Sequence, residues 1–221
     1  MAVTTLYPSS GNGWLGHSSA STWSGDRDAT NADSGQVQWG GTESDGLNVH
    51  GWNDHIRRPY FPFDLSSIPS GDIITGAVLK VYVYSDLRGG NYDNGVNVFQ
   101  TPQSSLTELV RSEYNIANWD LNPGATEIPT VSAGNFLEFT LNSTGLAWLP
   151  PGGNAFLGLL FKNDYDNNEI TGGANNLVYQ RLRWVGHPDV GTRPTLVITH
   201  EAGGGGGGAA QAARRGAVMM M

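Results

Sequence analysis

Ile74 to Tyr84 reads ITGAVLKVYVY, and this stretch decides the fold class. An extended chain places successive side chains on opposite faces, so the residues divide into two alternating sets. The first set is Ala77, Leu79, Val81 and Val83, and the second is Val78, Lys80, Tyr82 and Tyr84. The β-branched and aromatic side chains in these sets favour extended structure. We therefore predict a strand with each set on one face of a sheet.

Shorter stretches of similar character are separated by Gly, Pro, Asn and Asp along the rest of the chain. Residues 9–35 predict either a long ordered loop or two short edge strands, and the apolar run 155–162 (AFLGLLFK) indicates a buried central strand. About ten short strands favour an all-β fold, a jelly-roll-like antiparallel β-sandwich. The further strands are predicted at 3–7, 37–39, 47–52, 58–65, 96–100, 135–141, 177–184 and 194–200.

Helical patterns are rare in this chain. Residues 104–118 (SSLTELVRSEYNIAN) have apolar side chains at helical spacing after a serine that can cap a helix, so we predict one short helix there. Residues 143–149 predict a single helical turn before two prolines.

Composition excludes several functions. The net charge of −8 argues against binding nucleic acid through its phosphates. The absence of cysteine excludes a disulfide framework, and no apolar run has the length of a membrane span. The first residues, MAVTTLYPSSGNGW, lack the basic and apolar regions of an export signal, so we expect the chain to be made in the cytoplasm.

The C-terminal end differs from the rest of the chain. Residues 1–201 form the predicted β-sandwich domain, and 202–208 are a linker of one alanine and six glycines, which is flexible because glycine restricts the backbone least. Residues 209–221 (AAQAARRGAVMMM) form the predicted anchoring tail. We expect its cationic and apolar side chains to bind another component of an assembly. These residues are Arg214, Arg215, Val218, Met219, Met220 and Met221.

An acidic stretch, residues 163–169 (NDYDNNE), is the strongest candidate metal site. Carboxylate and amide oxygens are the ligands that Ca²⁺ takes, although the spacing is not that of an EF-hand. The candidate ligands are Asp164, Asp166, Asn168 and Glu169. The alternative is a solvated turn between two strands.

Aromatic residues in polar stretches are candidates for stacking on sugar rings. They are Trp14, Trp23, Trp52, Tyr92, Trp119 and Tyr165. The alternative is that they fill the ends of the core or lie in a subunit interface. Trp39, Trp148 and Trp184 lie in apolar or strand contexts, so we predict them in the core.

Three segments together resemble a known family. They are RRPYFPFDLSSIP at 57–69, ITGAVLKVYVY at 74–84 and RPTLVITH at 193–200. In this combination the chain resembles the DNRLRE-domain and carbohydrate-binding-module-like β-sandwiches over residues 3–200. The resemblance implies a sandwich without catalytic machinery, of the kind found in secreted polysaccharide-active proteins, surface adhesins and structural proteins of bacterial viruses.

Two functions follow as hypotheses. The first is a non-enzymatic virion protein of a bacteriophage, made in the host cytoplasm. It would be a capsid decoration or a tail-associated fibre protein that attaches to other virion proteins through its tail, and it would bind host polysaccharide. We expect it to be a homo-oligomer, for which a trimer is one cyclic form. The second is a carbohydrate-binding or adhesive module of a secreted or cell-surface protein. A polysaccharide lyase using Tyr179, Arg181, Arg183 and His187 has the least support.

Overall fold

The computed structural model describes residues 1–18, 22–37, 47–50, 56–88, 95–169, 177–183 and 189–203, with backbone alone for 36–37, 47–50, 87–88 and 177–179. The described strands are β1 (Ala2–Leu6), β2 (Gly13–His17), β3 (Ser34–Val37), β4 (Leu47–His50), β5 (Ile56–Asp64), β6 (Asp72–Arg88), β7 (Gly95–Gln100), β8 (Ile128–Pro129), β9 (Asn135–Thr140), β10 (Asn154–Phe161), β11 (Leu177–Leu182) and β12 (Thr195–Ala202). The helices are α1 (Trp23–Arg27), α2 (Ser143–Ala147) and α3 (Lys162–Tyr165), with 3₁₀ turns η1 (Arg111–Tyr114), η2 (Ile116–Asn118) and η3 (Val190–Thr192).

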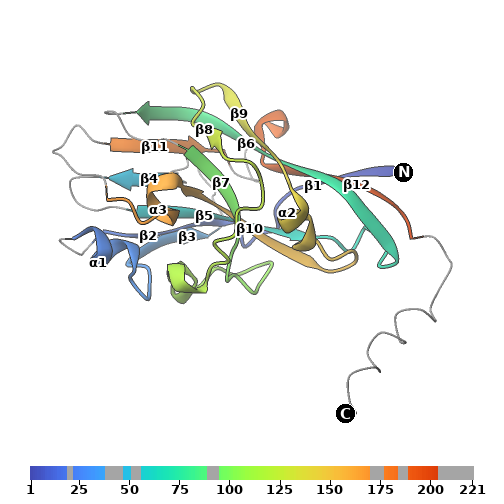
Figure 1. The fold of residues 1–221 in the computed structure, drawn as a ribbon, viewed down its shortest axis with the longest axis horizontal. Helices are drawn as coiled ribbons and strands as arrows, with labels where there is room; N and C mark the ends of the chain where they lie inside the picture. Colours follow the sequence, from blue (N-terminus) through green and yellow to red (C-terminus); the bar gives the residue numbers. More distant parts are fainter. Residues whose placement is uncertain are drawn as a thin grey trace, which may run out of the picture.

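The all-β prediction is confirmed: the fold is an antiparallel β-sandwich with a few short helices (Figure 1). The predicted strands from 3–7 to 194–200 are found wherever their residues are described, apart from a residue or two at some ends. Residues 9–35 contain β2, α1 and the start of β3, and α2 supplies the helical turn predicted at 143–149. The jelly-roll strand order stays a prediction.

Hydrogen bonds join the described strands into one antiparallel network, which runs β1-β12-β6-β11-β4-β5-β10-β7-β8. Strand β2 pairs with β3 and β5, and β9 pairs with β6. The network folds over on itself, because inward-facing side chains of β5, β6, β7, β9, β10 and β12 meet in one apolar core. On β6 this core takes the set predicted from alternation, Ala77, Leu79, Val81 and Val83, while the other set is only half-buried.

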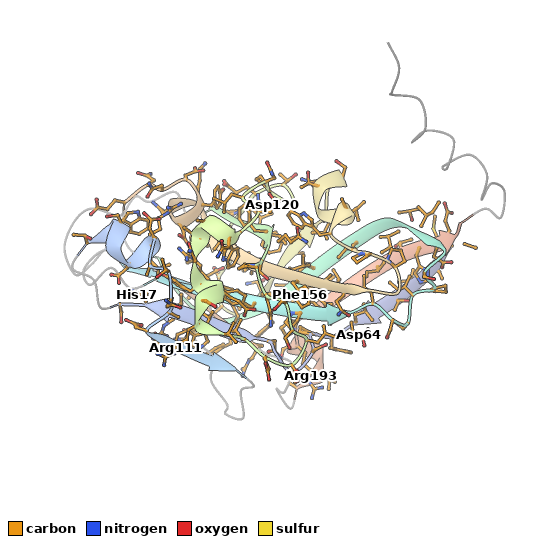
Figure 2. All side chains as sticks on the ribbon, turned by 90° about the horizontal axis from the view of Figure 1, so that it is seen from below. His17, Asp64, Arg111, Asp120, Phe156 and Arg193 are labelled. Carbon is orange, nitrogen blue, oxygen red and sulfur yellow. The ribbon has the colours of Figure 1, made fainter. Side chains whose placement is uncertain are left out.

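A second apolar cluster covers the opposite face of β5, β7 and β10. It contains Tyr60, Phe99 and Leu160 from these strands, and the segment 101–119 packs over them through Tyr114 and Trp119. Figure 2 shows this segment crossing the strands between Arg111 and Asp120. Strand β10 is therefore covered on both faces, which explains its continuous apolar sequence and confirms its predicted central position.

The helix predicted over 104–118 is wrong: only the 3₁₀ turns η1 and η2 form, between 111 and 118. Side chains take the place of helical hydrogen bonds. The carboxylate of Glu113 accepts from Ser104 N and Val110 N, and the amide of Gln103 donates to the carbonyls of Gly11 and Glu108. These contacts hold the chain extended, so that it can lie flat on the sheet.

The two ends of the molecule differ. Figure 1 shows α1 and α3 at one end, which we call the helical pole, while the N-terminus and the end of β12 lie at the opposite end. At that opposite end Gly203 N donates to Gly71 O at 3.2 Å. In the described part of the chain, no helix combines the length and the apolar character that a membrane crossing requires.

Candidate functional site

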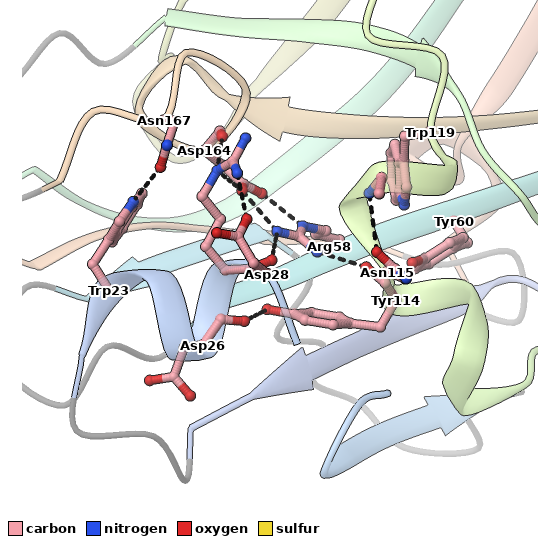
Figure 3. A network of polar contacts seen from close by, with 12 residues as sticks. Trp23, Asp26, Asp28, Arg58, Tyr60, Tyr114, Asn115, Trp119, Asp164 and Asn167 are labelled. Atoms are coloured by element: carbon pink, nitrogen blue, oxygen red, sulfur yellow. Dashed lines mark hydrogen bonds and ion pairs between the residues drawn. The ribbon is translucent and has the colours of Figure 1, made fainter. Parts of the chain in front are cut away.

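A buried ion pair joins strand β5 to helix α3. Arg58 Nε donates to Asp164 Oδ2 at 2.7 Å, and Arg58 Nη2 donates to Asp164 Oδ1 at 2.8 Å. This two-pronged contact is the strongest that a guanidinium makes with a carboxylate. Arg58 is 0% exposed and Asp164 is 1% exposed, so the pair lies away from solvent. Figure 3 shows it at the centre of a polar network.

Arg58 also donates to two backbone carbonyls. Nη1 donates to the carbonyl of Tyr114 at 2.6 Å, and Nη2 donates to the carbonyl of Arg27 at 2.9 Å. The guanidinium lies 4.2 Å from the ring centroid of Tyr114, within range of a cation–π contact. One side chain thus ties together β5, α1, α3 and η1, which are far apart in the sequence.

The short helices α1 and α3 are held to each other by further contacts in the same network. Arg27 Nε donates to the carbonyl of Asp164 at 2.7 Å, and Trp23 Nε1 donates to Asn167 Oδ1 at 3.1 Å. Asn167 follows α3 in the left-handed backbone region, at φ 52°, which Asn tolerates better than most residues. A helix of four or five residues is not stable alone, so these contacts maintain the helical pole.

The protonation of this network is fixed at neutral pH. Burial by itself lowers the pKa of Arg58, but the charge of Asp164 and the hydroxyls of Tyr114 and Tyr60 outweigh it, and the pKa is raised. Burial raises the pKa of both tyrosine hydroxyls. None of these three groups exchanges a proton near neutral pH.

The structure assigns Asp164 a different role from the predicted Ca²⁺ ligand, because Arg58 occupies both of its carboxylate oxygens. Asp166, Asn168 and Glu169 are exposed and do not converge with it. The stretch forms α3 and a turn, in which Asn168 N donates to Asn163 O at 2.9 Å. Within the described ranges, no three His, Asp or Glu side chains gather as a metal site would require.

Three of the aromatic residues that are candidates for stacking on sugar rings are buried. Trp14, Trp23 and Trp119 are 8%, 4% and 5% exposed. Trp23 belongs to the main core and Trp119 to the second cluster, which is the alternative that large aromatic side chains usually follow. Trp148, predicted in the core, is there.

Tyr165 is half-buried and is the predicted aromatic that lies nearest to solvent among those described. Its ring centroid lies 5.0 Å from that of Phe99, and its hydroxyl donates to Glu127. Lys162 Nζ lies 3.7 Å from Glu127 Oε1, and both side chains are about one-third exposed, at 34% and 33%. Tyr165, Glu127 and Lys162 form a small polar and aromatic surface patch, which we call the Tyr165 patch.

A second hydrogen-bonded group, not predicted from the sequence, lies at the end opposite to the helical pole. Asp72 Oδ2 is 2.7 Å from His200 Nδ1, and His200 Nε2 is 2.9 Å from Thr4 Oγ1. A bulge between β6 and β12 explains the meeting: Thr199 faces Gly76 but His200 faces Ile74, so Thr75 is extra. The bulge reverses the alternation on β6 and turns Asp72 to the face of His200.

The remaining predicted residues lie outside the described residues. They are Trp52, Tyr92 and the tail residues Arg214, Arg215, Val218, Met219, Met220 and Met221, together with the core candidates Trp39 and Trp184. Conversely, Arg58 was missed, although a charged residue within the apolar run at 58–65 is a signal for a buried pair.

Comparison with known proteins gives no identity for the chain: it matches no family model and no curated protein.

Proposed function

We propose that this protein is a non-enzymatic structural protein of a bacteriophage virion, a capsid decoration or tail-associated protein attached through its C-terminal tail. The observation that carries the proposal is the opposition of the two ends. The described chain finishes at Gly203, at the end away from the helical pole, and the glycine linker and tail follow it. Attachment at this end directs the helical pole away from the assembly.

The buried polar groups support a rigid, non-catalytic body. Arg58 donates to Asp164 and to two backbone carbonyls, and His200 of the Asp72–His200–Thr4 group links strands β6, β12 and β1. A satisfied buried network fixes one arrangement of the chain. Such a body suits display on a particle surface.

Glycan binding, if it accompanies attachment, is best supported at the Tyr165 patch. An aromatic ring beside a carboxylate and an amine offers a stacking face and hydrogen-bond partners for sugar hydroxyls. The patch lies on α3 and the residue before β8, near the helical pole. The second candidate function, a carbohydrate-binding or adhesive module, rests on this patch alone.

Particle incorporation tests the attachment proposal. Particles of the phage that encodes the chain are assembled with the full chain, with residues 209–221 deleted, and with 209–221 replaced by a Gly/Ser sequence of equal length. Quantitative mass spectrometry of purified particles measures the chain per particle. We expect both variants to be lost from particles and the R214A/R215A variant to be reduced. Normal incorporation of the deletion variant overturns the proposal.

Glycan binding is tested separately, by array binding of the full chain and of Y165A. Tyr7, which is 47% exposed and follows β1, provides the matched control Y7A. Loss of binding in Y165A but not in Y7A, together with normal incorporation of the tail deletion, favours the second function.

The geometry of the Asp72–His200–Thr4 group provides a test of the proposed non-enzymatic role. Asp72, His200 and Thr4 stand in the order of carboxylate, imidazole and hydroxyl that acyl-transfer enzymes use. Hydrolysis of an activated ester that is abolished by both T4V and H200A, with the fold intact, contradicts a non-enzymatic role.

A further inference from the structure

Strand β1 lies at one end of the strand network and pairs only with β12 among the described residues. Its five residues, AVTTL, pair continuously from Ala2↔His200 to Leu6↔Leu196. The other edge of β1 therefore presents backbone N–H and C=O groups, which are a template for one more strand.

Within Ala2–Leu6 this edge carries no charge, no proline and no bulge, which are features that protect many edge strands. The other described edges are better protected: β8 has two residues, one of them Pro129, and β9 carries the exposed Glu138. The edge strand β3 is short, with four residues, and the chain just before it is held to another segment, because Ala32 N donates to Arg111 O.

Two further observations indicate that β1 is a built surface and not a fraying terminus. The inward hydroxyl of Thr4 bonds to His200, which Asp72 holds in place, so the strand is fastened from below. Apolar side chains on and directly after β1 face solvent: Val3 is 66% exposed and Tyr7 is 47% exposed. Exposed apolar groups gathered next to an open edge are typical of an interaction site.

We infer that β1 pairs edge to edge with β1 of a second copy of this chain, antiparallel about a two-fold axis. The sheet then runs continuously from one copy into the other, in the order β6-β12-β1-β1-β12-β6. The occupant is a second copy because β1 is self-complementary: an antiparallel pairing of the strand with itself, centred on Thr4, sets Val3 of each copy opposite Thr5 of the other on the outer face.

Charge opposes a second copy least at this edge. Two chains of net charge −8 repel each other over most of their surfaces, so contact is least costly where the strand itself is uncharged. The dimer is a property of the β-sandwich and does not need the tail, so it is independent of the attachment proposed above.

Analytical ultracentrifugation of the full chain over about a hundredfold range of concentration tests the inference. We expect a monomer–dimer equilibrium that V3K weakens about tenfold or more, because two like charges then become diagonal neighbours on one face of the new strand pair. The matched control is T140K, which places the same charge at an exposed position of the β9 edge. T140K leaves the dimer unchanged.

Hydrogen exchange locates the contact. Amides of residues 2–6 gain protection as the concentration rises, and those of β9 do not. A monomer at every concentration, a trimer, or a dimer weakened by T140K and not by V3K overturns the inference. A dimer lost when Met219, Met220 and Met221 are replaced by serine in the full chain assigns the contact to the tail and also overturns it.

Discussion

Arg58 and Asp164 are 106 residues apart in the chain, yet their side chains meet in a buried two-pronged ion pair with contacts of 2.7 and 2.8 Å. The pair joins α3, which follows β10 directly, to strand β5. Because carbonyls of Arg27 and Tyr114 complete the shell, Arg58 is the point at which the helical pole is assembled.

Replacement of either partner should be strongly destabilising. R58M and D164L each leave the other charge buried and unpaired, which costs about 3–5 kcal/mol of unfolding free energy. The double variant is expected to be less destabilised than the sum of the two by about 0.5–3 kcal/mol. Urea unfolding measures all three, with R111A as the control, since Arg111 is exposed. Additive losses would contradict the pairing.

Gly158 on β10 should tolerate no larger residue. A Cβ there would lie 2.6 Å from Thr101 Cγ2, 2.7 Å from Trp119 Cη2 and 2.8 Å from the carbonyl of Pro59. We expect G158A to destabilise by about 1–3 kcal/mol through overpacking. The control is G76A on β6, where the nearest atom, Thr199 Cβ, is 3.9 Å away. Equal melting temperatures for the two variants would refute this packing.

Glu113 should make stability depend on pH. Burial raises the pKa of its carboxyl, and the N–H groups of Val110 and Ser104 offset this only in part. The folded state therefore keeps a proton that the unfolded state has already lost, so the contribution of Glu113 to the unfolding free energy falls as pH rises from about 4.5 to the raised folded pKa. Above that pH the loss is constant.

E113Q removes this titration. The unfolding free energy of E113Q relative to the parent is expected to rise with pH across that window, measured by urea unfolding at a series of pH values. E108Q, at an exposed position of the same segment, serves as the control and should show no such slope. A pH-independent difference for E113Q would mean that its carboxyl ionises alike in the folded and unfolded states.

Thr4 should determine how firmly β1 is held. T4V keeps the shape of the side chain but removes its hydrogen bond to His200, with an expected loss of about 0.5–1.5 kcal/mol. Hydrogen exchange of the amides of residues 2–6 should become faster. T5V is the matched control, because Thr5 is exposed and lies on the outer face. Similar exchange rates in the two variants would show that the Asp72–His200–Thr4 group does not hold β1 in place.

The local pattern of the sequence identified the strands because it depends on neighbouring residues alone. Alternation at Ile74–Tyr84 specified which side chains of β6 share a face, and the apolar run at 155–162 specified a central strand. The helix predicted at 104–118 failed because side chains from outside its periodic positions, Gln103 and Glu113, take up the backbone groups that a helix would satisfy.

The sites depended on contacts that no local pattern encodes. Asp164 carries the chemistry of a calcium ligand, and Trp14, Trp23 and Trp119 the chemistry of a sugar platform, but burial gives them other partners. Whether a carboxylate binds a cation from solvent or an arginine from the core depends on which distant segment packs against it.

The sequence by itself therefore determined the all-β class and the positions of most strands, because alternation is a property of short stretches. Only the tertiary structure decided the Arg58–Asp164 pair, the Asp72–His200–Thr4 group and the open edge of β1. The first two join segments that are distant in the chain, and the third is the place where the strand network stops. All three exist only when the whole sandwich has folded.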